Sequence, residues 1–325
     1  MVDLRLLNGL GNILFQYAYA RIVAESRGYA LRFRSDPGEG REGMVYDAPT
    51  VADAASYYPT LAALFDGFLA LEGREITTDP LYVMTPNVLT AHDVRRAGDL
   101  IECDQRMDLA DHQRVINHPG MIVIESWLQD YKLFRPYKRD VRRFYTPRLL
   151  GDMPDEEDAV MHIRLGDYPT CCNTLPLEYY QSMVQRFTDR NVVGVTDSPD
   201  HFYVEALNEE PNFSLYDGTG FRCDGIDDAS RRVVADFLFM LNTRGPLILS
   251  NSSFCWWAAF LSHAELVLHP LMSQETRARI SGEEAMTVDV RNRAEYDPYW
   301  ILDETHPSQP DLFVDDETRW IRAVI

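Results

Sequence analysis

Short apolar runs alternate with amphipathic segments through the second half of the chain. The runs at 159–165, 192–196, 213–216, 247–250 and 265–268 predict strands, because each is brief, mostly apolar and bounded by turn residues. The segments at 177–188, 199–207, 228–241 and 254–263 predict helices. Regular alternation of this kind predicts a parallel, doubly wound α/β sheet.

The first half opens with a similar unit and then becomes harder to interpret. A strand at 4–7 leads into a turn with Gly9 and Gly11, and then into a helix whose apolar face includes Phe15, Ala18 and Ile22. Residues 121–125 predict a second strand, whereas 35–118 show no readable pattern. The tail after 290 is also without a readable pattern, and we expect that it could pack back over the second domain. The acidic stretch 151–158 is interpreted as a linker between domains of 1–150 and 151–325.

Composition narrows the possible functions. The 325 residues, 46% of them hydrophobic, are enough for two folded domains. A net charge of −20 argues against non-specific nucleic-acid binding, which needs a basic field. Five cysteines without metal-ligand spacing favour a reducing compartment. No leader precedes the first strand, and no apolar run approaches the ~18–20 residues of a membrane span, so we expect a cytoplasmic protein with at most peripheral membrane association.

The most informative segment is His-Ile-Arg-Leu-Gly-Asp-Tyr at 162–168. Side chains alternate along a strand, so Val160, His162 and Arg164 share one face, with the last two about 6.6 Å apart. Ligands of open α/β sheets bind at the carboxyl ends of strands, so this pair is placed to hold a phosphate or pyrophosphate. The alternative is structural: Arg164 pairs with a carboxylate such as Asp167, and His162 is a core histidine.

Two further strand ends carry polar residues. Ser252 or Ser253 is expected to cap the apolar helix that follows, and a helix start with free N–H groups and hydroxyls also suits a phosphate. Trp256 and Trp257 are interpreted as core residues, with stacking on a sugar or base as the alternative. Asp197 follows the strand at 192–196, where it either accepts hydrogen bonds from a base or ribose or caps the next helix.

The N-terminal glycines either let a ligand approach the backbone or form a plain tight turn. A dinucleotide fingerprint requires a third glycine where this chain has Leu14, so NAD binding fits poorly.

Taken together, these motifs resemble the α-1,2-fucosyltransferases of glycosyltransferase family 11. The resemblance rests on Gly-Leu-Gly-Asn with Phe-Gln-Tyr-Ala and Ala-Arg at 9–21, His-x-Arg-x-Gly-Asp-Tyr at 162–168, and Ser-Asn-Ser-Ser-Phe-x-Trp-Trp at 250–257. The stretch 127–134 also resembles the family's aromatic-Gln-x-x-Lys-x-Phe segment. The motifs occur in the family's order and extend from residue 9 to about 261.

The resemblance implies a GT-B architecture: α/β, with two Rossmann-like domains whose parallel, doubly wound sheets face a central cleft. GDP-fucose would be the donor, held by the C-terminal domain, and a galactose-terminated oligosaccharide would be the acceptor, held mainly by the N-terminal domain. No metal or cofactor would be needed. The implied donor-binding residues are Gly9, Gly11, Asn12, His162, Arg164, Asn251, Ser252, Ser253 and Phe254, with Asp197 or Asp236 reading guanine or ribose.

The implied reaction is inverting transfer of L-fucose to O2 of the galactoside, giving an α-1,2 linkage. The implied catalytic residues are Asn12, His162, Arg164 and Asp167. Charge on the leaving GDP would be offset by Arg164, His162 and the helix N-terminus. Asp167 is the candidate general base, although the same carboxylate could orient Arg164.

Three positions depart from the family pattern. Leu165 stands where many members have a second arginine, Ile13 replaces a common glutamine, and Ser198 replaces an acidic residue. By alternation Leu165 should face away from Arg164. The departures leave two alternatives open: a GDP-sugar transferase forming another linkage, and a glycan- or nucleotide-binding protein without turnover.

Overall fold

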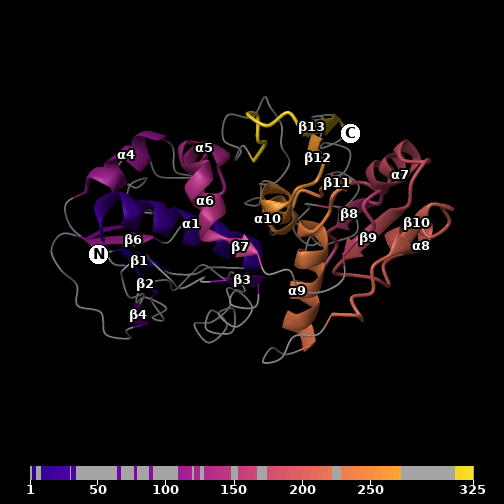
Figure 1. The fold of residues 1–325 in the computed structure, drawn as a ribbon, viewed down its shortest axis with the longest axis horizontal. Coiled ribbons are helices and arrows are strands. Elements are labelled where there is room, and N and C mark those ends of the chain that lie inside the picture. Colours follow the sequence, from indigo (N-terminus) through magenta and orange to yellow (C-terminus); the bar gives the residue numbers. More distant parts are fainter. Residues whose placement is uncertain are drawn as a thin grey trace, which may run out of the picture. The chain divides into compact units, whose positions relative to one another are not determined.

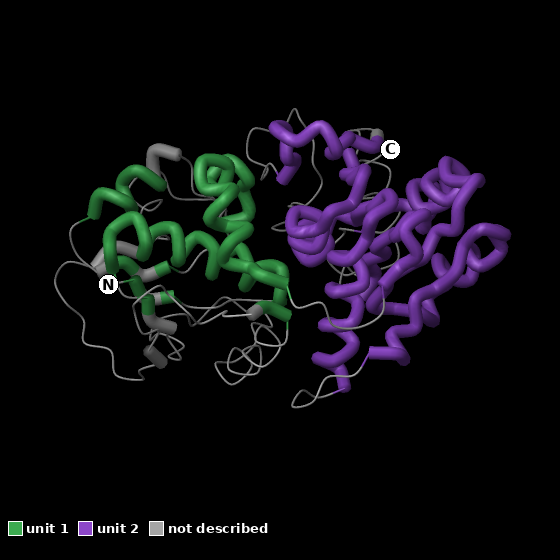
Figure 2. Tube along the Cα trace, viewed as in Figure 1, with its two compact units in different colours: residues 1–148 green, residues 149–325 purple. Residues whose placement is uncertain are grey.

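The chain folds into two compact units, 1–148 and 149–325 (Figure 2). The computed structural model describes residues 2–4, 9–29, 31–33, 64–66, 77–78, 88–90, 109–118, 121–124, 128–147, 153–166, 174–221, 228–271 and 312–324. Each unit is an α/β structure around a parallel sheet, which confirms the predicted fold class. The assignment of acceptor and donor roles to the two halves stays a prediction.

The first unit holds a five-stranded sheet in the order β4-β2-β1-β6-β5, with parallel neighbours throughout. Its strands are β1 (Val2–Leu4), β2 (Leu31–Phe33), β4 (Thr77–Thr78), β5 (Val88–Thr90) and β6 (Met121–Ile124). An antiparallel pair is formed by β3 (Phe65–Asp66) and β7 (Thr146–Pro147). The helical segments are α1 (Leu10–Arg27), α4 (Leu109–Asn117), α5 (Tyr131–Phe134), the 3-10 helix η1 (Arg135–Tyr137) and α6 (Lys138–Phe144). The strand expected at 121–125 is confirmed, while β1 begins two residues before the expected 4–7, and residues 5–8 lie outside the described part.

The first motif lies at the start of α1. Gly9 is the N-cap and Gly11 is in the first helical turn, so both glycines lie at the start of the helix. Gly9 has φ −71° and ψ 170°, a conformation open to any residue, and a Cβ there would meet nothing within 4 Å. The protein's own backbone therefore does not require glycine at position 9.

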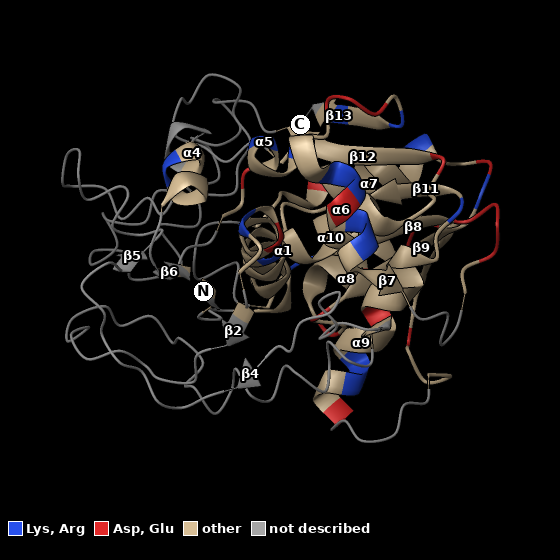
Figure 3. Ribbon diagram, turned by 60° about the vertical axis from the view of Figure 1, so that its left-hand side comes forward, with Lys and Arg blue, Asp and Glu red and all other residues tan. Residues whose placement is uncertain are grey.

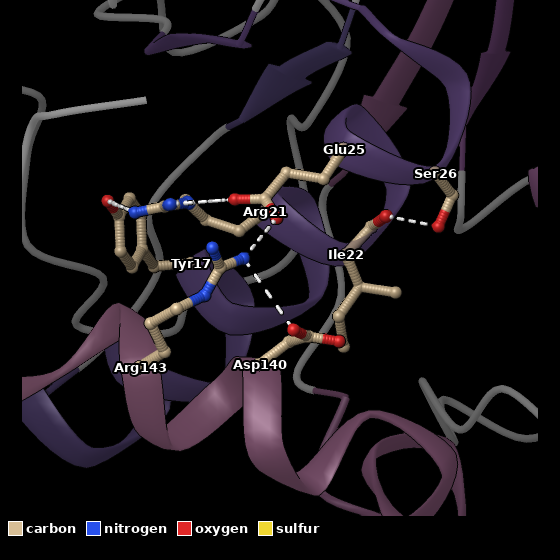
Figure 4. A network of polar contacts seen from close by, with 7 residues as sticks. All are labelled: Tyr17, Arg21, Ile22, Glu25, Ser26, Asp140 and Arg143. Carbon is tan, nitrogen blue, oxygen red and sulfur yellow. Dashed lines mark hydrogen bonds and ion pairs between the residues drawn. The ribbon is translucent and has the colours of Figure 1, made fainter. Parts of the chain in front are cut away.

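Arg21, the last residue of that motif, has a structural environment within the first unit. Its Nη2 lies 2.7 Å from Glu25 Oε1 and its Nη1 donates to Tyr17 Oη at 3.1 Å. Arg143 of α6 reaches the other Glu25 oxygen at 3.0 Å (Figure 4). Because Arg21 is buried, these contacts compensate its charge and connect α1 to α6.

The second unit holds a six-stranded parallel sheet in the order β10-β9-β8-β11-β12-β13. Its strands are β8 (Ala159–Ile163), β9 (Val192–Thr196), β10 (Phe213–Leu215), β11 (Pro246–Ile248), β12 (Leu266–Leu271) and β13 (Trp320–Val324). Its helices are α7 (Leu177–Arg186), α8 (Phe202–Leu207), α9 (Asp228–Leu241) and α10 (Ser253–Leu261). Every strand and helix expected between 159 and 268 is present, with ends shifted by at most three residues.

The sheet of the second unit is covered on both faces. Met161 and Ile163 of β8 belong to a buried cluster with Tyr180 and Val184 of α7 and Leu207 of α8. Alternation turns Val160 and His162 to the opposite face. There, α9 and α10 cover the sheet (Figure 1). All five residues of β8 are buried, which explains its continuous apolar sequence.

Two segments flank the expected elements of the second unit. The described part of the acidic stretch, 153–158, follows the boundary between the units at 148 and 149 and belongs to the second unit. It packs so closely that a Cβ on Gly245 would lie 2.3 Å from the carbonyl oxygen of Asp158. The unreadable tail supplies β13, which pairs in parallel with β12 from Val267↔Trp320 onward. Among the described helices, none is long and apolar enough to cross a membrane.

Candidate functional site

The site lies at the carboxyl edge of the second sheet, where the strand order reverses. Numbered from β8 in chain order, the six strands run 3-2-1-4-5-6, so the chain leaves β8 to one side and later returns as β11 on the other. The crevice at such a switch point is where open α/β sheets bind ligands. His162 on β8 and Ser250, just beyond β11, meet here: Nδ1 of His162 lies 2.7 Å from Oγ of Ser250.

His162 is buried and neutral. Only 3% of the residue is exposed, and this burial, with a smaller contribution from the Arg164 charge, lowers the pKa of His162 to about 3, although Asp197 acts in the opposite direction. The expectation that His162 would help to offset charge on the leaving GDP stays a prediction, and a neutral ring would do so by donating a hydrogen bond. At neutral pH this ring contributes a hydrogen bond and no net charge.

Arg164, directly after β8, is held by Asp197, directly after β9. Nη1 of Arg164 lies 2.6 Å from Oδ2 of Asp197. The other carboxylate oxygen accepts hydrogen bonds from the N–H groups of Leu165 and Gly166, each at 3.0 Å. Burial alone would raise the pKa of the Asp197 carboxyl, but Arg164 and the two N–H groups hold it below its usual value. The proposed pairing partner Asp167 lies outside the described residues.

Close packing against Asp197 explains the glycine at position 166. A Cβ on Gly166 would lie 2.7 Å from Oδ2 of Asp197, the oxygen that contacts Arg164. Leu165 is buried in the apolar cluster beneath α7, so it faces away from Arg164 as alternation predicts.

The capping role considered for Asp197 is wrong, because His201 is the N-cap of α8 and accepts from the N–H of Tyr203. Recognition of a base or ribose by Asp197 stays a prediction.

The polar residues before α10 cap that helix. Ser252 is the N-cap, and its Oγ accepts a hydrogen bond from the N–H of Phe254 at 3.3 Å, which confirms one of the two expected caps. Asn251 and Ser253 are also buried. No charged residue occurs in α10 (Figure 3), so its N-terminal dipole is not neutralised from within the helix. Trp256 and Trp257 are buried, which confirms their interpretation as core residues.

Asp236 lies on α9, the other helix on this face. Its Oδ1 is 2.8 Å from Nε of Arg232, whose Nη2 donates to the carbonyl of Tyr216 beyond β10 at 2.9 Å. Burial raises the pKa of Asp236 to about 7, and the charge of Asp197 adds to the effect. Asp236 is thus close enough to Asp197 for the two carboxylates to influence each other.

The structure brings most of the expected donor-site residues together within the second unit. His162, Arg164 and Asp197 lie at neighbouring strand ends, and the start of α10 adjoins them through the rings of Phe254 and His162, 5.8 Å apart. The remaining candidates belong to the first unit. Gly9, Gly11 and Asn12 begin α1, where Oδ1 of Asn12 accepts a hydrogen bond from Nε2 of Gln129.

Sequence reasoning missed Ser250 as a site residue. The available signal was its position as the first polar residue after a buried strand at the predicted ligand edge. Among the described residues, no group of three or more His, Cys, Asp or Glu could hold a metal ion.

Comparison with known proteins agrees with the expected resemblance. No family model matches the chain. It is 24% identical over 286 residues to an α-1,2-colitosyltransferase of Escherichia coli, a match covering 82% of this chain and 89% of that protein. This relative confirms the resemblance to glycosyltransferases.

Similar solved structures include fucosyltransferase NodZ from Bradyrhizobium, with 13% identity, a TM-score of 0.48 and coverage of 80% of this chain and 92% of that one. FUT1 of Arabidopsis thaliana in complex with GDP has 15% identity, a TM-score of 0.44 and coverage of 85% and 71%. The α/β architecture of this chain follows from its own strand order.

Proposed function

We propose that this protein is an inverting glycosyltransferase that moves L-fucose from GDP-β-L-fucose to O2 of a terminal galactoside, forming an α-1,2 linkage. The observation that carries the proposal is the arrangement at the switch point. The guanidinium of Arg164, fixed by Asp197, lies at the same sheet edge as His162. The N-terminus of α10, a helix without charged side chains, lies at this edge too. This combination suits the diphosphate of a sugar nucleotide. The 286-residue similarity to a sugar transferase with α-1,2 specificity supports both the reaction class and the linkage.

In the proposed reaction, O2 of the acceptor attacks C1 of fucose from the face opposite GDP. The C1–O bond to the β-phosphate breaks, its electron pair leaves with GDP, and the O2 proton passes to a base. Arg164 and the N-terminus of α10 stabilise the negative charge that develops on the diphosphate. His162 adds a neutral hydrogen bond. Asp167 remains the proposed base, and Asn12 with Gly9 and Gly11 the proposed contribution of the first unit. No metal takes part in this proposal.

A second donor should be tested directly because the Escherichia coli relative is an α-1,2-colitosyltransferase. The purified protein would be incubated separately with GDP-fucose and GDP-colitose, a panel of β-galactosides and EDTA. GDP release and the linkage of the product are then measured. We expect an α-1,2-fucosylated galactoside.

Transfer from GDP-colitose alone would change the donor but keep the reaction class. A different linkage would overturn the acceptor position. GDP binding without transfer from either donor would favour the alternative of a binding protein without turnover. Loss of activity with EDTA would contradict metal independence.

A further inference from the structure

Three buried polar groups meet at the switch point: the hydroxyl of Ser250, the ring of His162 and the thiol of Cys255. Oγ of Ser250 lies 2.7 Å from Nδ1 of His162 and 3.6 Å from Sγ of Cys255. All three residues are buried. Each neutral group carries a single polar hydrogen, so the positions of the acceptors decide where each hydrogen lies.

The thiol hydrogen is directed to backbone oxygen. Sγ of Cys255 lies 3.1 Å from the carbonyl oxygen of Ser252 and 3.4 Å from that of Ser250, and both oxygens can only accept. The hydroxyl of Ser250 then has two possible acceptors: a ring nitrogen at 2.7 Å and a sulfur, itself a weak acceptor, at 3.6 Å. The shorter bond to the better acceptor is favoured, so Ser250 donates to Nδ1 of His162.

This assignment determines the tautomer of the histidine. A neutral ring holds one hydrogen, and burial keeps this ring neutral by lowering the pKa of His162. With Nδ1 accepting, the hydrogen must be on Nε2. Among the described residues, no acceptor contacts Nε2. The hydrogen on Nε2 is therefore available to an acceptor that a ligand would supply.

We infer that Ser250 is a positioning residue that holds His162 as its Nε2–H tautomer, so that the ring donates a hydrogen bond to a diphosphate oxygen of the sugar nucleotide. The ligand part of this inference rests on the proposed function. The ring of Phe254, in the first turn of α10, lies 5.8 Å from the ring of His162, so the helix N-terminus adjoins the proposed donor. In this arrangement His162 transfers no proton in the reaction.

The test is nitrogen NMR of the protein with ¹⁵N-labelled histidine rings, with a His162→Gln variant to identify the resonances of His162 among the eight histidines. Wild type should show a hydrogen on Nε2 and none on Nδ1. Ser250→Ala should shift this pattern toward a mixture of tautomers, and Ser250→Thr, which keeps the hydroxyl, should restore it. Addition of GDP, but not guanosine, should move the Nε2 resonance of wild type.

Calorimetry with GDP gives the functional readout. Ser250→Ala should bind GDP about 2- to 10-fold more weakly, as expected when one ordered side chain is released. Ser262→Ala is the matched control: Ser262 is a buried serine at the other end of α10, whose Oγ donates to the carbonyl of Ala259 at 2.8 Å. This control should keep both the tautomer and the GDP affinity within twofold of wild type.

Two outcomes would overturn the inference: a wild-type ring with its hydrogen on Nδ1, or an unchanged tautomer pattern in Ser250→Ala. If Ser250→Ala does not fold, the wild-type spectrum still decides the tautomer. Wild type that shows the Nε2–H tautomer but binds no GDP would instead contradict the proposed function. An Nε2 resonance that responds to guanosine as strongly as to GDP would reject the diphosphate as the acceptor.

Discussion

Arg164 and Asp197 join the ends of two neighbouring strands through an ion pair of 2.6 Å. The two side chains are 30% and 27% exposed, so the pair is neither deeply buried nor fully solvated. Asp197 also holds the N–H groups of Leu165 and Gly166, which means that one carboxylate orients both the guanidinium and the backbone that carries it. The consequence is a cation held in one direction at the edge where a diphosphate is proposed to bind.

Arg164→Ala should abolish most of the transfer activity while the protein stays folded. Loss of one group that stabilises developing charge typically lowers the rate about 10²- to 10³-fold, and we expect kcat/KM to fall by that order. The matched control is Arg190→Ala, which removes a 3.0 Å ion pair with Glu265 at the opposite edge of the same sheet. Near-normal kcat/KM in Arg164→Ala, or an equal loss in Arg190→Ala, would contradict the phosphate assignment.

Asp197→Asn should weaken GDP binding by releasing Arg164. The amide keeps the shape of the side chain and an oxygen for the two N–H groups, but it removes the charge that pairs with the guanidinium. Affinities for GDP and IDP, measured by calorimetry, separate this role from recognition of the base. We expect both nucleotides to lose affinity by the same factor. A loss confined to GDP would show instead that Asp197 contacts the exocyclic amine of guanine.

Asp236 should make stability depend on pH. Its carboxyl has a pKa of about 7 in the folded protein and 3.8 as the unperturbed value, so between these values the folded state binds more protons than the unfolded chain. Stability contributed by this group is therefore present at low pH and falls as the pH rises from about 4 to 7. Asp236→Asn should raise Tm relative to wild type more at pH 8 than at pH 5.

Asp228→Asn is the control for that pH effect. Asp228 begins the same helix, and its side chain is 94% exposed. The Tm difference between this variant and wild type should be the same at both pH values. If Asp236→Asn also shows equal differences at pH 5 and pH 8, the raised pKa is wrong.

Arg319→Ala should destabilise the second unit through the C-terminal end of α10. Nη2 of Arg319 donates to the carbonyl of Ala259 at 3.0 Å, and Nη1 donates to the carbonyl of Ala264 at 3.3 Å. Losing hydrogen bonds from a charged donor to these carbonyl groups costs about 1.5–3 kcal/mol of the free energy of unfolding, which denaturant titration would measure. Arg231→Ala, which removes an exposed pair with Asp228, should cost less than about 0.5 kcal/mol. Equal losses in the two variants would reject the capping role.

The site residues that could be predicted are those identified by the pattern of their neighbours in the sequence. An apolar run that ends in polar residues identifies a strand and its ligand edge, which located His162, Arg164 and the cap at Ser252. The partners of these residues could not be predicted. Leu165 and Asp197 are separated by 32 positions, and His162 and Ser250 by 88. Their contacts arise because β9 and β11 flank β8 in the sheet.

Periodicity and strand-end chemistry in the sequence were therefore sufficient for the α/β class, the order of elements from 159 to 268 and the edge that carries the candidate site. The strand order decided which side chains meet, since alternation predicts the face on which a residue lies but not its neighbour. Burial in the assembled sheet made His162 neutral, because an ion loses its hydration there. The strand β13 likewise had no local signal, because its pairing depends on the edge that β12 offers after folding.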